Sequence, residues 1–176
     1  MTASHQLINQ TSGGVEWFTP NNIIEAAREA MGSIDLDPAS SEAANVATVH
    51  SRRFFTKEDD GLRRIWQAGT IWLNHPFGRQ STPRWIKKLV DEYELGNFDQ
   101  ACTITYASTS EKWFQRLLKF PQCFLNGRTN YISAETMIPV KGASKGSVVT
   151  YLGPKGRTGN FAEAFSKLGT IKVEYT

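Results

Sequence analysis

Residues 70–96, TIWLNHPFGRQSTPRWIKKLVDEYELG, contain an apolar strand, a polar turn and an amphipathic helix in immediate succession. The strand is the run 70–73, and the turn is Asn74-His75-Pro76-Phe77-Gly78-Arg79. Thr82 followed by Pro83 is typical of a helix start with the threonine as N-cap, and apolar side chains then recur at helical spacing. A strand joined to a helix by such a short turn is typical of α/β proteins with parallel strands.

Strand-like and helix-like segments also alternate upstream of this stretch. Thr19 followed by Pro20 predicts another helix start, and apolar residues at helical spacing continue to Gly32, which is expected to end the helix. A short strand is expected at residues 34–37. It leads into a helix of small residues around 43–47.

Downstream, the chain becomes richer in strands. Residues 101–106 are typical of a strand, and Ser108 with Glu111 fits a capping box that opens a further helix. The remaining strand candidates are 123–125, 129–132, 147–152 and 170–175, with a last helix at about 160–168. The pattern predicts a single α/β domain whose mostly parallel sheet has helices on both faces and an antiparallel edge.

The composition is that of an ordinary globular protein, with 176 residues, 40% hydrophobic and 21% charged. A net charge of +3 permits nucleic-acid binding without requiring it. No apolar run reaches the ~20 residues that span a bilayer, and the start of the chain lacks the apolar core of a signal peptide. Cys102 and Cys123 are predicted to be buried free thiols, and the histidines lack metal-ligand spacing. We therefore expect a cytoplasmic protein without a metal, with a mobile tail at 1–14 and one domain at 15–176.

The turn after the strand at 34–37 is a candidate ligand site, because ligands in open α/β sheets bind beyond the carboxyl ends of strands. The small residues of Asp37-Pro38-Ala39-Ser40 allow a ligand to approach the backbone. Ser40 or Ser41 can cap the next helix, whose N-terminus favours a negative group. The same residues also fit an ordinary strand-to-helix turn.

The turn after residues 70–73 suits recognition of a planar amine. The side-chain oxygen of Asn74 and the carbonyl of residue 75 can each accept one N–H of an exocyclic amino group, while Phe77 stacks on the ring. Two acceptors withdraw the nitrogen lone pair from the ring and direct it at an electrophile. Taken alone, this short motif is equally typical of a turn with a packed phenylalanine.

Four segments occur in a fixed order along the chain. They are EWFTP at 16–20, IDLDPASS at 34–41, FTKEDDGL at 55–62 and WLNHPFG at 72–78. The ordered set resembles the Dam-like DNA N6-adenine methyltransferases encoded by phages and prophages. The similarity continues through residues 85–88, 109–114 and 127–128, so that it covers roughly residues 15–169.

The resemblance implies a Rossmann-like methyltransferase fold that uses S-adenosylmethionine and acts on double-stranded DNA in the bacterial host, with the target adenine flipped out of the duplex. It implies a cofactor pocket formed by the segment before the first helix, the turn after the first strand and the acidic turn. These residues are Trp17, Phe18, Thr19, Pro20, Asp37, Pro38, Ala39, Ser40 and, from the acidic turn, Asp60 or Asp59.

The catalytic motif of the family is Asn or Asp, then Pro, Pro, and Tyr or Phe. It maps onto Asn74, His75, Pro76 and Phe77. The implied reaction is direct methyl transfer to adenine N6, with catalysis from orientation and from the acceptors at N6. His75 departs from the usual proline. Its backbone carbonyl can serve as that of proline does, and we expect its ring to face outward; a catalytic imidazole and a loss of activity are the alternatives.

Contacts with DNA are expected from basic and polar residues in the loops. Residues 79 and 80 follow the catalytic motif directly, and the Gly- and Lys-rich segments 141–146 and 154–159 can follow a phosphate backbone or form solvated turns. The predicted DNA-binding residues are Arg79, Gln80, Arg128, Lys141, Lys145, Lys155 and Arg157. The length leaves little room for a separate recognition domain, so we expect a short or relaxed recognition sequence, or a homodimer that builds one across an interface.

Three other functions remain open at this stage. Methylation of cytosine N4 uses similar chemistry, although Asn rather than Ser at position 74 favours adenine. Methylation of a protein glutamine is a rival, but the glycine-rich cofactor loop of those enzymes is absent here. The third is a cofactor- or DNA-binding homologue that has lost turnover.

Overall fold

The computed structural model describes residues 17–173, so the predicted tail at 1–14 lies outside the described residues. The strands are β1 (Trp17–Phe18), β2 (Leu36–Asp37), β3 (Arg53–Phe54), β4 (Ala68–Leu73), β5 (Phe98–Tyr106), β6 (Gln122–Leu125), β7 (Ile132–Ser133), β8 (Ser147–Leu152) and β9 (Gly169–Lys172). The helices are α1 (Asn21–Met31), α2 (Glu42–Ala44), α3 (Ser81–Glu94), α4 (Lys112–Gln115) and α5 (Thr158–Phe165), with a π-helical turn at Asn45–Val49 and a 3₁₀ turn at Lys155–Arg157.

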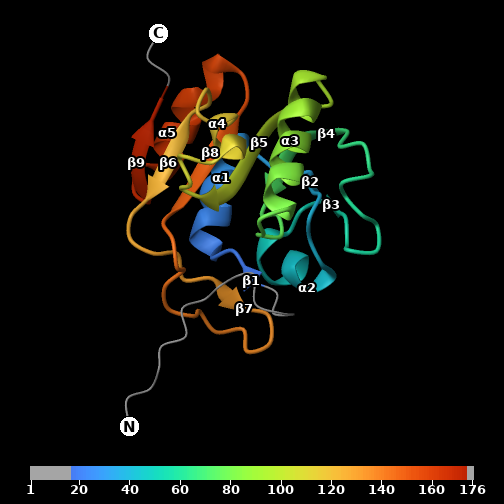
Figure 1. Cartoon of the computed structure of the whole chain (residues 1–176), viewed down its shortest axis with the longest axis vertical. Coiled ribbons are helices and arrows are strands. Elements are labelled where there is room, and N and C mark those ends of the chain that lie inside the picture. Colours follow the sequence, from blue (N-terminus) through green and yellow to red (C-terminus); the bar gives the residue numbers. More distant parts are fainter. Residues whose placement is uncertain (1–16, 174–176) are drawn as a thin grey trace.

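Seven strands form one mixed sheet in the order β3-β2-β4-β5-β8-β6-β9 (Figure 1). Strands β3, β2, β4 and β5 pair in parallel, and the pairs on the other side of β5 are antiparallel. The α/β class is confirmed, as is an antiparallel edge strand, β9. The sheet is more antiparallel than expected, because β8 returns inside it between β5 and β6. No helix crosses over between β6 and β8, so the chain re-enters the sheet in the opposite direction.

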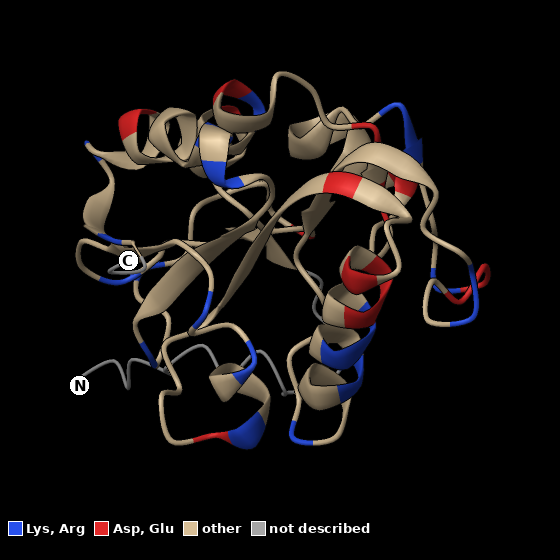
Figure 2. Ribbon diagram, turned by 90° about the horizontal axis from the view of Figure 1, so that it is seen from above, with Lys and Arg blue, Asp and Glu red and all other residues tan. Residues whose placement is uncertain are grey.

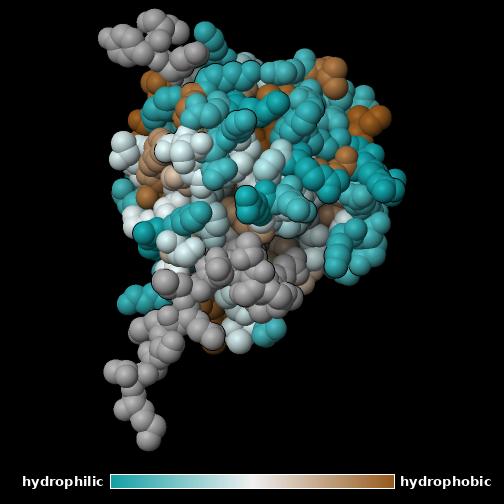
Figure 3. Space-filling model, viewed as in Figure 1, coloured by the Kyte–Doolittle hydropathy of each residue, from teal (hydrophilic) through white to brown (hydrophobic). Residues whose placement is uncertain are grey.

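Helices lie on both faces of the sheet, as expected (Figure 2). On one face, α1 and α5 pack over Trp72, Cys102 and Tyr151. On the other face, α3 packs over side chains of β2, β4 and β5. Both cysteines are buried free thiols, and burial raises their pKa. The surface in Figure 3 is mostly hydrophilic, and no helix among residues 17–173 is long and apolar enough to cross a membrane.

Three predicted helix caps are wrong in detail. Pro20, not Thr19, is the N-cap of α1, because its extended backbone (ψ 142°) lies outside the helix while its carbonyl accepts the first helical N–H. Helix α3 begins at Ser81, and the hydroxyl of Thr82 accepts the N–H of Gly78 at 3.2 Å from within the first turn. Glu111 is itself the N-cap of α4, and it makes no side-chain cap bond.

A two-stranded ribbon of β1 and β7 stands apart from the main sheet, at the same end of the molecule as α2 (Figure 1). Trp17 pairs with Ser133 and Phe18 with Ile132. The strand expected at 129–132 is therefore displaced toward Ser133, because its partner is β1 rather than the main sheet. This ribbon fixes residues 17 and 18 at the carboxyl edge of the parallel strands.

A buried glutamate connects α3 to the chain that enters β4. Glu92, only 7% exposed, accepts hydrogen bonds from the backbone N–H of Trp66 (3.3 Å) and from Asn97 Nδ2 (2.7 Å), and it pairs with Lys88. Trp66 in turn stacks on Trp85 of α3. Burial raises the pKa of Glu92, but the hydrogen bonds from Lys88, Asn97 and Trp66 outweigh it and hold that pKa below its ordinary value.

We predict that Glu92→Gln lowers the free energy of unfolding at pH 7 by about 1–2 kcal/mol, because Gln loses the charge that pairs with Lys88 and one acceptor oxygen. The pKa of Glu92 is lower in the folded state, so its stabilisation is full above the unfolded pKa and is lost as the pH falls toward the folded one. Urea unfolding at pH 7 and pH 4 should therefore show a smaller acid-induced loss for the variant. Asp91→Asn, in the neighbouring exposed pairs, should cost less than about 1 kcal/mol. Equal acid dependence in wild type and Glu92→Gln would contradict the prediction.

Candidate functional site

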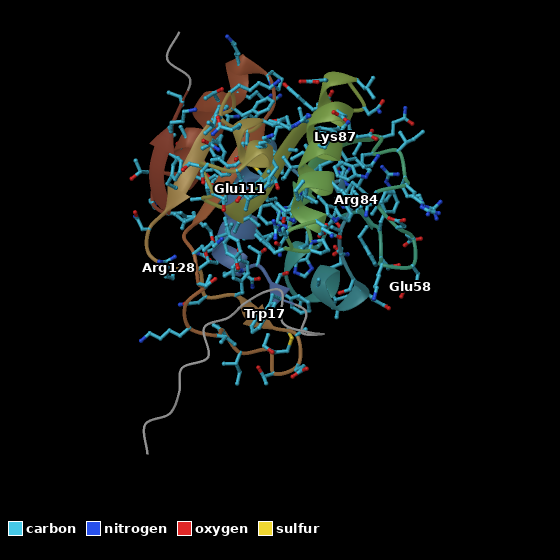
Figure 4. All side chains as sticks on the ribbon, viewed as in Figure 1. Trp17, Glu58, Arg84, Lys87, Glu111 and Arg128 are labelled. Atoms are coloured by element: carbon cyan, nitrogen blue, oxygen red, sulfur yellow. The ribbon has the colours of Figure 1, made fainter. Side chains whose placement is uncertain are left out.

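A cavity of about 750 Å³ opens at the carboxyl ends of β2 and β4. Four segments supply most of its lining: residues 17–19 of and after β1, residues 37–42 and 44 of and after β2, residues 56–58, 60 and 61 of the acidic turn, and residues 72 and 74–77 at the end of β4. Thr48, Val49 and Trp85 complete it. The cavity brings together all four predicted catalytic residues and every predicted cofactor residue except Pro20 and Asp59. Figure 4 shows two of the lining residues, Trp17 at the lower end of the molecule and Glu58 to the right of it.

The side chain of Asn74 is oriented by β1. Its Nδ2 donates to the backbone carbonyl of Trp17 at 3.4 Å. A carbonyl can only accept, so this contact determines which end of the amide is nitrogen. The opposite atom, Oδ1, is buried without a hydrogen-bond partner. Asn74 therefore presents an unused acceptor at the end of β4.

Aromatic rings follow the asparagine. The ring of Phe77 lies 4.8 Å from that of His75 and 4.7 Å from that of Tyr106, measured between centroids. The ammonium group of Lys145 lies 5.8 Å from the Tyr106 ring. Phe77 itself is half-buried, so the motif carries a partly accessible aromatic side chain that packs on His75 and Tyr106.

The expectation that the His75 ring faces outward is wrong. His75 is 1% exposed and packs against Phe77. Its Nδ1 lies 3.2 Å from the carbonyl of Pro76, which can only accept, so Nδ1 carries the proton and Nε2 keeps a lone pair. Nε2 is buried without a partner. Burial lowers the pKa of His75 to about 4, so the ring is neutral at pH 7.

The turn after β2 is closed by its own polar side chains. Asp37 Oδ1 accepts the N–H of Ala39 at 3.1 Å, which forms an Asx turn. Ser41 Oγ accepts the N–H of Ala44 at 3.1 Å, so Ser41 rather than Ser40 caps α2. The sequence left these two serines open, and the side-chain geometry distinguishes them.

The acidic turn packs directly on the turn after β2. A Cβ atom on Gly61 would lie 1.9 Å from the carbonyl oxygen of Pro38, so only glycine fits between the two backbones. The indole N–H of Trp66 donates to the Gly61 carbonyl at 2.8 Å and holds the turn in place. The two ligand-facing turns therefore form one continuous wall of the cavity.

The structure distinguishes the two aspartates of the acidic turn. Asp59 is engaged inside the turn, where Oδ2 accepts the backbone N–H and the hydroxyl of Thr56, both at 2.9 Å. These bonds lower the pKa of Asp59. Asp60, with a left-handed backbone (φ 52°) and an ion pair to Arg63, lines the cavity.

Several lining residues were not predicted from the sequence. Glu58 belongs to the acidic turn that was recognised, yet only Asp59 and Asp60 were singled out in it. Trp72 lies within β4, and its buried indole N–H has no partner. Trp85 reaches the cavity from α3. Strand alternation and the helical period could have placed the two tryptophans on faces of the sheet, but not at this cavity.

The predicted DNA-binding residues divide between two sides of the sheet: the side at the carboxyl ends of β4, β5 and β6, and the side at their amino ends. Residues 79 and 80 follow the end of β4, and Arg128 follows β6, whose carboxyl end lies at the same edge. Lys141 and Lys145 lie in the segment between β7 and β8. Strand β8 begins at Ser147, which pairs with Tyr106 at the end of β5, so this segment ends at the same side of the sheet as the cavity. By contrast, β8 carries the chain away from the cavity, so Lys155 and Arg157 lie at the opposite edge. They belong to the 3₁₀ turn before α5 rather than to a phosphate-following loop.

We predict that His75 makes folding stability depend on pH. Its folded-state pKa is about 4, below the ordinary value of 6.5, so the unfolded chain binds the proton more readily. The free energy of unfolding should fall as the pH is lowered from 6.5 toward 4. His75→Asn should remove this part of the dependence, while His50→Asn, at an exposed position, should keep it. Urea unfolding between pH 7 and pH 4.5 measures the difference, and identical slopes for the two variants would refute the assignment.

Comparison with known proteins gives two consistent matches. A sequence model of the DNA N-6-adenine-methyltransferase (Dam) family matches residues 9–166. The DNA N-6-adenine-methyltransferase of Escherichia phage T1 is 28% identical over 151 residues, which are 76% of this chain and 60% of the phage protein. The chain thus spans about 60% of the length of this relative. Because the family match covers nearly the whole described domain, the chain belongs to the DNA N-6-adenine-methyltransferase (Dam) family.

Proposed function

We propose that this protein transfers a methyl group from S-adenosylmethionine to N6 of an adenine in double-stranded DNA, with the base flipped out of the duplex. The observation that carries the proposal is the buried, unpartnered Oδ1 of Asn74, a residue oriented by the Trp17 carbonyl that lines the same cavity as the turns after β2 and β3. Family membership supports the same chemistry. An unused acceptor at this position is what an exocyclic amino group requires.

The cavity fits the cofactor by size and by chemistry. Its volume, about 750 Å³, lies within the range of cofactor sites. Two lining residues, Trp72 and Thr19, each carry a buried polar group without a partner, an indole N–H and a hydroxyl, which a ligand's polar groups can satisfy. Glu58 and Asp60 add carboxylates that can accept hydrogen bonds from the hydroxyl groups of a ligand. S-adenosylmethionine bound here supplies an electrophilic methyl group.

The protein's own residues orient the amine. Asn74 Oδ1 accepts one N–H of the adenine amino group, and the backbone carbonyl of His75 accepts the other. Phe77 contacts the face of the base. Holding both N–H groups in place directs the nitrogen lone pair toward the cofactor, and rate enhancement comes from this orientation and from the two acceptors. The neutral His75 ring supports Phe77 without adding charge.

We predict that Asn74→Ala strongly slows methyl transfer. The purified protein is incubated with unmethylated duplex DNA and methyl-labelled S-adenosylmethionine, and the labelled nucleoside is identified by mass spectrometry. Wild type should yield labelled N6-methyl-2′-deoxyadenosine. The variant should be at least about 100-fold slower, because it loses an acceptor whose removal costs on the scale of an oxyanion-hole donor. Cofactor affinity should change little.

Other outcomes of this assay are informative. Label on cytosine would move the assignment to cytosine N4. Absence of label in the presence of cofactor binding would overturn the proposed function in favour of a homologue without turnover or of an enzyme with a protein substrate.

We predict that Gly61→Ala weakens cofactor binding. The added methyl group meets the Pro38 carbonyl oxygen at 1.9 Å, so the acidic turn and the turn after β2 must separate. Isothermal titration calorimetry with S-adenosylmethionine should show roughly tenfold weaker binding or worse, in line with 1.4 kcal/mol per factor of ten. Gly156→Ala, where a Cβ atom meets open space, should bind as wild type does. Equal affinity of the two variants would show that this contact does not shape the cofactor site.

A further inference from the structure

A second, smaller pocket lies on the other side of the β1–α1 connection. Its volume is about 320 Å³, and it lies between the first turn of α1, the loop after β6 and the segment after β7. Residues 17–19 line the large cavity, whereas Pro20, Asn22 and Ile23 line the small pocket. The same stretch of chain is therefore a wall of both.

Three features of the small pocket favour an anion. Helix α1 has eleven residues, and its N-terminus, with the partial positive charge of unpaired N–H groups, lies at the pocket. Among the described residues that line it, Arg128 is the only charged one. Figure 4 shows Arg128 on the loop that follows β6.

The third feature is independent of the helix. Thr129 is 7% exposed, it lines the same pocket, and its hydroxyl oxygen is buried without a hydrogen-bond partner. A buried hydroxyl without a hydrogen-bond partner lowers the stability of the folded protein. A ligand oxygen that accepts a hydrogen bond from it would recover this free energy. Helix N–H groups, a guanidinium and a hydroxyl together form a donor set suited to phosphate oxygens.

We propose that this pocket binds a backbone phosphate of the DNA strand that carries the target adenine. The inference rests on the proposed function, because that function supplies the phosphodiester. Strand β6 runs parallel to β5, so Arg128 lies at the same edge of the sheet as Asn74. A strand that crosses residues 17–23 would place its flipped base in the large cavity and a phosphate in the small pocket. Such a contact fixes the position of the strand without reading its sequence.

Duplex binding, measured by fluorescence anisotropy at several salt concentrations, tests the proposal. Arg128→Gln should weaken binding about tenfold and lower the slope of log affinity against log salt by about 0.9, the value of one released counterion. Thr129→Val should weaken binding roughly threefold without changing that slope, because it removes a neutral hydrogen bond. Its melting temperature should not fall, since the hydroxyl has no partner within the protein.

The matched control removes one positive charge from the opposite edge. Lys119 precedes β6, where it pairs with the exposed Glu94 and its ammonium group lies 5.2 Å from the Phe120 ring centroid, so Lys119→Gln should bind DNA within about twofold of wild type. A scan with single neutral methylphosphonate linkages near the target adenine adds a second test. One linkage should weaken binding by wild type and leave binding by Arg128→Gln unchanged, which pairs that phosphate with the guanidinium.

Methyl transfer is measured on the same samples to separate the two proposals. If wild type transfers label but Arg128→Gln binds no more weakly than Lys119→Gln, or Thr129→Val binds as wild type does, the phosphate site is refuted and the proposed function stands. If the binding effects appear without any transfer of label, the phosphate site stands and the proposed function fails. If Arg128→Gln weakens the binding of free inorganic phosphate but leaves DNA affinity unchanged, the contact with DNA is refuted.

Discussion

Reciprocal hydrogen bonds between Asp35 and Thr70 hold β2 and β4 in parallel register. The backbone N–H of Asp35 donates to the carbonyl and the hydroxyl of Thr70, and the Asp35 carboxylate accepts the N–H of Thr70, each at 3.1 Å. This register pairs Leu36 with Ile71 and so brings the turn after β2 beside Asn74. A shift of one residue would turn every following side chain to the other face of the sheet. The geometry of the large cavity depends on this pairing.

Further from the sheet, the cavity wall depends on backbone contact rather than on side-chain packing. The backbone of Gly61 packs against the Pro38 carbonyl too closely for a Cβ atom, and the Trp66 indole N–H donates a hydrogen bond to the Gly61 carbonyl. Trp66 is itself anchored to α3 through Glu92 and Trp85. A chain of contacts thus extends from a buried ion pair on α3 to the turn that we propose binds the cofactor. The rigid elements carry the site, and the loops shape it.

Several of the buried polar groups without partners belong to residues that line the two pockets, while others, such as the Thr105 hydroxyl, lie elsewhere in the core. Asn74 Oδ1, the Trp72 indole and the Thr19 hydroxyl belong to the large cavity, and the Thr129 hydroxyl belongs to the small pocket. Each such group lowers stability unless a ligand satisfies it. Their common location supports one ligand-binding surface along the carboxyl edge of the sheet, divided by the β1–α1 connection. Lys155 and Arg157, at the opposite edge, lie outside that surface.

The sequence alone determined the α/β class and the end of β4 at Leu73, and the ordered motifs of the family resemblance grouped the turns after β2, β3 and β4, because strand and helix periods and short motifs are local properties. Only the tertiary structure decided that β8 lies inside the sheet, that Asp60 rather than Asp59 lines the cavity, and that the His75 ring is buried. These features depend on contacts between segments far apart in the chain. Pairing with β5 fixes the direction of β8, and packing at the end of β4 fixes the ring, so no local pattern encodes either.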